Sequence, residues 1–155
     1  MKPPLESALT HLPHGPEFRF LDRLISLVPG VEGAGEYRLR GDELFLKGHF
    51  PVEPLMPGVL MVEAIAQLAG VIAQSDPGRS PLVALKLTAI RVAKITGSLH
   101  PGETLIMNVQ VLARMGNLIQ ASGTATVGGR LVIKCELALS GNAETTPKPV
   151  ESATI

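Results

Sequence analysis

The chain has 155 residues, enough for a single domain with a hydrophobic core. Apolar residues make up 45% of it, charged residues 18%, and the formal net charge is zero at pH 7, so it lacks the positive charge typical of nucleic-acid binders. We therefore expect no nucleic-acid partner. The only cysteine, Cys135, excludes an internal disulfide and a cysteine-based metal cluster. Because we see no secretory signal and no run of about 18 apolar residues, we also expect a cytoplasmic protein that does not insert into a membrane.

Two segments with strand character precede the one long helical segment. They lie near residues 19–28 and 33–40 and are separated by a Pro-Gly turn. The helix is predicted at about 57–75, where Ala, Leu and Met dominate and Pro57 stands in the first turn, a position that tolerates proline. Because nearly every face of this helix is apolar, we expect other structure to surround it.

Four more segments with strand character follow the helix. They are rich in Val, Ile, Leu and Thr, are separated by glycine-containing turns, and lie near residues 82–95, 104–113, 117–127 and 130–139. The predicted fold class is α+β, with one antiparallel β-sheet wrapped around a central helix. We assign residues 1–140 to a single domain and expect the polar, aperiodic tail at 141–155 to be disordered.

Two residues stand out as candidates for acid–base chemistry. His49 follows Gly48, which permits close backbone approach, and histidine is the commonest proton carrier near neutral pH. Glu63 lies in the apolar helix, and a buried carboxylate needs a partner, a proton or a cavity. An ion pair with Lys94 or Arg91 is the structural alternative for Glu63.

Other polar groups share this helix. Gln67 and Gly70 follow Glu63 by four and seven residues, which puts all three on one stripe and predicts a polar, open face. Gly58 stands where helical N–H groups lack intrahelical partners, so it either presents its N–H to a carbonyl oxygen or only permits close packing. The remaining histidines are expected to cap, pack or face solvent: His11, His14 and His100.

Taken together, these motifs resemble the 3-hydroxyacyl-[acyl-carrier-protein] dehydratases of bacterial fatty-acid synthesis. The resemblance rests on Leu12-Pro13-His14, Leu21-Asp22-Arg23, Gly48-His49-Phe50-Pro51, and the run from Pro54 to Gln67 with its undisturbed spacing between histidine and glutamate. It implies the hot-dog fold, a homodimer that often assembles as a trimer of dimers into a hexamer, and acyl carrier protein as the partner that carries the substrate.

The resemblance also implies roles for the site residues. His49 and Glu63 would act together, one from each subunit of a dimer, to convert a (3R)-3-hydroxyacyl thioester into a trans-2-enoyl thioester without a metal or cofactor. His49 would remove the C2 proton and Glu63 would protonate the departing hydroxyl, directly or through water; alternatively, His49 carries the proton both ways. The expected substrate-binding set is Gly58, Gln67, Phe50 and Pro57, with Gly58 polarising the thioester carbonyl and Gln67 orienting Glu63.

The chain departs from the family pattern at two places. Val52 and Glu53 replace a usual Gly-Lys pair, which bears on docking of the carrier protein, and residues 87–92 lack the usual aromatic and acidic residues of the tunnel wall. Glutamate rather than aspartate at position 63 favours dehydration without isomerisation. The competing functions are a hot-dog acyl thioesterase, which leaves the Gly-His-Phe-Pro motif unexplained, and a non-catalytic acyl-binding homologue.

Overall fold

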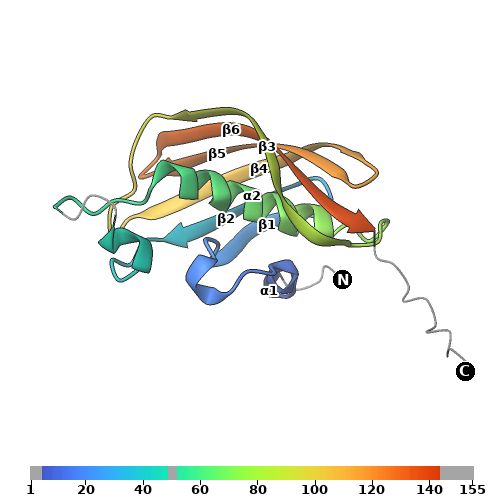
Figure 1. The fold of residues 1–155 in the computed structure, drawn as a ribbon, viewed down its shortest axis with the longest axis horizontal. Helices are drawn as coiled ribbons and strands as arrows, with labels where there is room; N and C mark the ends of the chain where they lie inside the picture. Colours follow the sequence, from blue (N-terminus) through green and yellow to red (C-terminus); the bar gives the residue numbers. More distant parts are fainter. Residues whose placement is uncertain (1–4, 49–51, 144–155) are drawn as a thin grey trace, which may run out of the picture.

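The computed structural model describes residues 5–48 and 52–143. Its main elements are one long helix and six antiparallel strands, in the spatial order β1-β2-β4-β5-β6-β3 (Figure 1). The sheet curves around the helix. The elements are β1 (Arg23–Val28), β2 (Glu32–Arg38), α2 (Gly58–Gln74), β3 (Leu82–Ile95), β4 (Thr104–Met115), β5 (Leu118–Val127) and β6 (Arg130–Ala143). The predicted α+β hot-dog architecture is confirmed.

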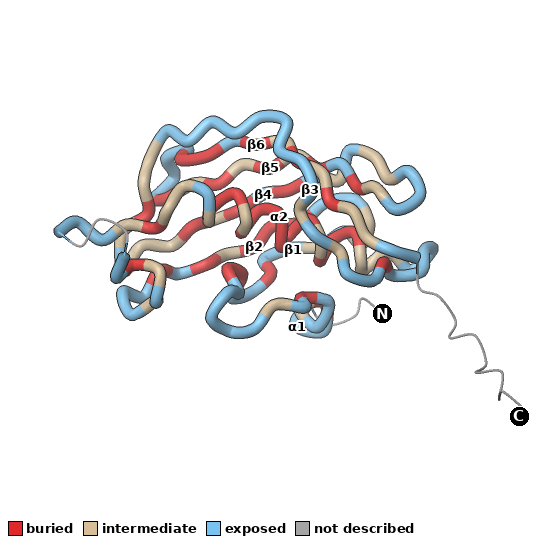
Figure 2. Tube along the Cα trace, viewed as in Figure 1, coloured by how far each residue is buried: buried red, intermediate tan, exposed pale blue. Residues whose placement is uncertain are grey.

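Helix α2 is central because it is apolar on almost every side. Ala64, Ile65 and Leu68 are fully buried, and Figure 2 shows buried stretches along α2 and on the strands that face it. The sheet approaches the helix closely at Gly123, where an added Cβ would lie 2.5 Å from Cγ2 of Ile65. A side chain at position 123 would therefore push the helix away from the sheet. Within the described residues, no helix is long and apolar enough to cross a bilayer.

Several single helical turns surround these main elements. They are α1 (Leu5–Ala8), η1 (Leu9–His11), η2 (Pro16–Phe18) and η3 (Leu44–Lys47). The sequence did not predict them, because one turn is too short to show helical periodicity. The first three belong to an N-terminal segment that runs beside α2 and replaces the beginning of the first predicted strand, which starts at Arg23 instead of near residue 19.

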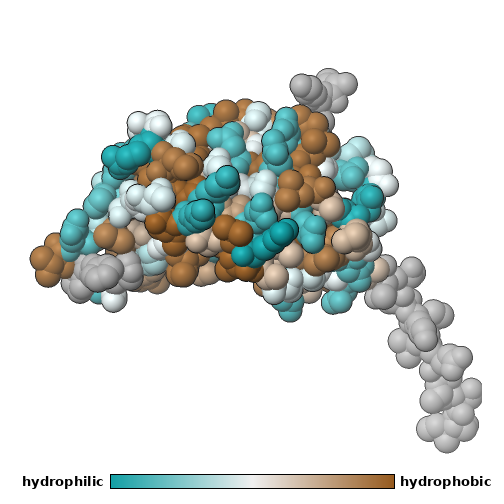
Figure 3. Space-filling view, turned by 90° about the horizontal axis from the view of Figure 1, so that it is seen from above, coloured by the Kyte–Doolittle hydropathy of each residue, from teal (hydrophilic) through white to brown (hydrophobic). Residues whose placement is uncertain are grey.

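Strand β3 forms one edge of the sheet and is largely exposed. Its register with β6 shifts at three places, and Ala84 has a positive φ of 55°. Several of its apolar side chains are exposed: Val83, Ile90, Val92 and Ile95. Seen from above the view of Figure 1, the molecule presents apolar areas interrupted by hydrophilic side chains (Figure 3). An edge strand with exposed apolar side chains is a suitable surface for pairing with another chain.

Strand β6 continues past the boundary expected at residue 140. Gly141 donates its N–H to the carbonyl of Asn117 at 3.1 Å, and Asn142 and Ala143 pair with Val83 and Leu82. The folded domain therefore extends to Ala143, and the rest of the expected tail, 144–155, lies outside the described residues.

We predict that a chain ending at Ala143 melts at the same temperature as the full-length protein. A chain ending at Ser140 should melt at least about 4 °C lower, because it loses the last pairs between β6 and β3 at roughly 1 kcal/mol per hydrogen bond. Circular dichroism melts of the three proteins test this. A Ser140 truncation as stable as the full-length chain, or an Ala143 truncation that unfolds, would contradict the assignment of this boundary.

Candidate active site

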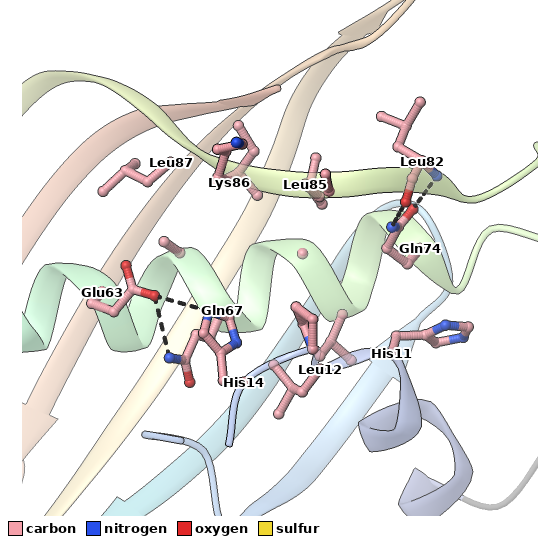
Figure 4. Close-up of a pocket in the computed structure, with 16 residues that line it drawn as sticks. His11, Leu12, His14, Glu63, Gln67, Gln74, Leu82, Leu85, Lys86 and Leu87 are labelled. Atoms are coloured by element: carbon pink, nitrogen blue, oxygen red, sulfur yellow. Dashed lines mark hydrogen bonds and ion pairs between the residues drawn. The ribbon is translucent and has the colours of Figure 1, made fainter. Parts of the chain in front are cut away.

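A cavity opens between α2, the N-terminal segment and the start of β3 (Figure 4). It holds about 600 Å³ of empty space, part of which is open to solvent. One stripe of α2 lines it, formed by Glu63, Ala66, Gln67, Gly70 and Gln74. Apolar walls come from leucines at positions 12, 85, 87 and 139. The polar, open face that the helical spacing predicted is therefore observed, and the cavity has the apolar walls that an aliphatic chain needs.

Glu63 lies at one end of this cavity with its side chain 18% exposed. Its Oε1 is 3.3 Å from Nε2 of His14 and 3.3 Å from Nε2 of Gln67. The structural alternative, an ion pair with Lys94 or Arg91, is wrong, because the partner is His14 and Arg91 lies 3.8 Å from Glu136 instead. The carboxyl thus has one hydrogen-bond donor, Gln67, and one close ring nitrogen, from His14, at the same oxygen, and it borders the cavity.

Gln67 fixes the surroundings of Glu63. It is 3% exposed, and its Oε1 accepts a hydrogen bond from the backbone N–H of Phe20 at 2.8 Å. Its Nε2 donates to the carbonyl of Phe18 at 2.8 Å and to Glu63. These bonds determine which end of the amide is nitrogen, since only the nitrogen can donate to a carbonyl oxygen.

His14 was expected to cap or pack, and its contact with Glu63 is a site feature that the sequence reasoning missed. The two residues are far apart in the chain, and no local periodicity relates them. The available signal was the Leu-Pro-His motif, which belongs to the stretch resembling the dehydratases. Figure 4 shows the His14 ring directed at the Glu63 carboxyl from the N-terminal segment.

The other predicted residues are less closely assembled. Pro57 is the N-cap of α2 and Gly58 its first residue, so the Gly58 N–H has no intrahelical acceptor. An added Cβ on Gly58 would lie 2.6 Å from Cδ1 of Ile95, which shows that this glycine permits close packing against β3. Neither residue lines the cavity beside Glu63. His49 and Phe50 lie outside the described residues, so their predicted roles stay predictions.

Other reactive side chains do not compete with this site. Burial raises the pKa of the Cys135 thiol to about 11, so it is a poor nucleophile at neutral pH. His100 lies 3.0 Å from Glu103 and 3.5 Å from Glu53 near the turn between β3 and β4. Across residues 5–48 and 52–143, no group of three His, Cys, Asp or Glu side chains is arranged to hold a metal ion.

Known proteins resemble this chain in sequence and in fold. The family model for the FabA-like domain matches residues 12–136. A "3-hydroxyacyl-[acyl-carrier-protein] dehydratase FabZ" from Roseiflexus castenholzii is 34% identical over 90% of this chain and 97% of that protein. A protein of the same name from Anaeromyxobacter sp. is 37% identical over 81% of each chain.

Among solved structures, the dehydratase heterocomplex ApeI:P from Xenorhabdus doucetiae has a chain that superposes with a TM-score of 0.73 at 15% identity, covering 93% of this chain and 94% of that one. Zebra fish thioesterase superfamily member 2 superposes with a TM-score of 0.66 at 13% identity, covering 91% and 100%. At these identities the two structures show a shared fold. The sequence matches show family membership as well as fold. By these matches the chain belongs to the FabA-like family, together with the FabZ dehydratases.

Proposed function

We propose that this protein is a 3-hydroxyacyl-[acyl-carrier-protein] dehydratase of fatty-acid biosynthesis, which converts (3R)-3-hydroxyacyl thioesters into trans-2-enoyl thioesters. The observation that carries the proposal is Glu63: a mostly buried carboxyl, held through one oxygen, at the end of a largely apolar cavity. Sequence relatives that span most of the chain bear the name of this activity.

The reaction needs a base at C2, an acid at the C3 hydroxyl and support for negative charge on the thioester oxygen. We assign the base to His49, the acid to Glu63 and the charge support to the N–H of Gly58. The C2 proton moves to the imidazole, its electron pair forms the double bond, and the C3–O bond breaks as the hydroxyl takes the Glu63 proton and leaves as water. Because Gln67 donates to Oε1 of Glu63 and His14 lies 3.3 Å from the same oxygen, Oε2 is the oxygen available for this transfer.

The proposed working unit is a homodimer in the cytoplasm, with three dimers assembling into a hexamer. Edge strand β3 supports this, since it exposes Val83, Ile90 and Ile95 at 50%, 52% and 48%. Burying such side chains between two copies contributes roughly 25 cal/mol per Å² of apolar surface. In this dimer, His49 of one subunit meets Glu63 of the other.

The proposed partner is acyl carrier protein bearing the substrate. Val52 and Glu53 replace the usual Gly-Lys pair. Val52 is 99% exposed, and the side chain of Glu53 is 75% exposed. They therefore offer an apolar residue and a negative charge at the surface where the family usually has a positive charge. A thioesterase function is the less favoured alternative, because the likeness to a thioesterase is one of fold alone.

We predict that His49→Ala and Glu63→Gln each lower turnover of a 3-hydroxyacyl thioester by about 10²–10⁴-fold, the usual effect of removing a general acid or base. The assay follows enoyl absorbance and free thiol together. Glu32→Gln, an exposed carboxylate in β2, is the matched control and should retain wild-type turnover. Release of thiol without enoyl product would indicate a thioesterase instead, and no product of either kind would indicate a binding protein.

Mixing the two inactive variants tests the shared site. Co-refolding equal amounts of His49→Ala and Glu63→Gln chains gives heterodimers as half of the population, and each keeps one intact site of two. Activity should recover to about a quarter of wild type per chain. Differential tags verify that heterodimers form. If these mixed dimers are no more active than the separate variants, both residues of a site come from one chain.

A further inference from the structure

The contact between His14 and Glu63 connects the N-terminal segment to the proposed acid. Nε2 of His14 is 3.3 Å from Oε1 of Glu63, and the histidine side chain is 27% exposed. The ring also lies against Phe18, with 6.1 Å between ring centroids. Both His14 and Glu63 line the same cavity. His14 is therefore part of the wall in which Glu63 would meet a substrate.

The position of the ring hydrogen follows from what surrounds each nitrogen. Nδ1 of His14 is buried and has no hydrogen-bond partner among the described residues, whereas Nε2 faces a carboxyl oxygen. A hydrogen on Nδ1 would leave a buried donor unsatisfied and set the Nε2 lone pair against an oxygen lone pair. The arrangement favours a ring hydrogen on Nε2, directed toward Glu63, over one on Nδ1.

Gln67 donates a hydrogen bond to the same oxygen of Glu63 at 3.3 Å. Its amide is fixed by the backbone of Phe18 and Phe20, so its nitrogen keeps its direction independently of His14. Figure 4 shows both dashed contacts converging on one oxygen of Glu63 while the second oxygen points away from them. The Gln67 hydrogen bond and the close His14 ring at Oε1 restrict rotation of the carboxyl and leave Oε2 as the oxygen with no donor in the described part of the chain.

We propose that His14 is a positioning residue of this site, which donates from Nε2 to Oε1 of Glu63 and so presents Oε2 to the substrate. The inference rests on the proposed dehydratase function and assigns the Leu-Pro-His motif a role at the reacting centre. A packing role alone would not explain a polar ring here, because an apolar side chain could fill the same space without burying an unpartnered Nδ1.

Two substitutions separate positioning from packing. His14→Phe keeps a ring against Phe18 but has no donor, whereas His14→Gln supplies an amide N–H that can reach the same oxygen. We expect His14→Phe to lower kcat by about 10–100-fold, the loss of one hydrogen bond to an ionisable group, with a much smaller change in KM. His14→Gln should restore kcat to within a few-fold of wild type. Equal melting temperatures would show that both variants fold.

Each outcome decides the proposal. Near-normal kcat for His14→Phe, or equally low kcat for both variants, would overturn it. If His14→Phe does not fold, nitrogen NMR of the wild-type ring replaces the kinetics: hydrogen on Nε2, with a signal displaced by Glu63→Gln, supports the proposal, and hydrogen on Nδ1 overturns it. An inactive wild-type enzyme would instead refute the dehydratase function, and the NMR result would still test the His14 contact.

Discussion

The hydrogen bonds of Gln67 hold the candidate site together. This buried amide bonds to the N–H of Phe20 and the carbonyl of Phe18, and the same nitrogen also reaches Glu63. Neither residue belongs to a strand, so the Phe20 N–H and the Phe18 carbonyl have their hydrogen-bond partner in Gln67 instead of in the sheet. One side chain of α2 therefore positions both the segment that carries His14 and the carboxyl that His14 contacts.

The position of Gln67 depends in turn on the packing of α2 within the sheet. A helix buried on most sides cannot turn about its axis without disturbing the contacts of Ile65 and Leu68, and Gly123 lets the sheet approach closely. The stripe that carries Glu63 and Gln67 is the part of the helix left facing the cavity. Stability and function thus use different faces of one element. Burial of the polar face costs less free energy because the Gln67 amide and one oxygen of Glu63 have hydrogen-bond partners.

Most of the fold could be predicted from the sequence. The central helix and the strands after it have typical residue compositions and are separated by glycine- and proline-containing turns. The helical spacing correctly placed Glu63, Gln67 and Gly70 on one face. The end of β6 was harder to predict from the sequence, because glycine and asparagine at positions 141 and 142 are typical of turns. Gly141 and Asn142 pair only with segments that are distant in the chain. His14 could not be assigned from local pattern, since its contact with Glu63 depends on the path of a segment without regular periodicity.

The most direct test of this account is where the oxygen of water enters the product. Dehydration is reversible, so a trans-2-enoyl thioester can be incubated with the protein in water enriched in oxygen-18 and compared with an enzyme-free control. We predict that mass spectrometry finds the label in the C3 hydroxyl of an intact thioester. Label found instead in the carboxylate of a released fatty acid would contradict the dehydratase account and assign the Glu63 cavity to thioester hydrolysis.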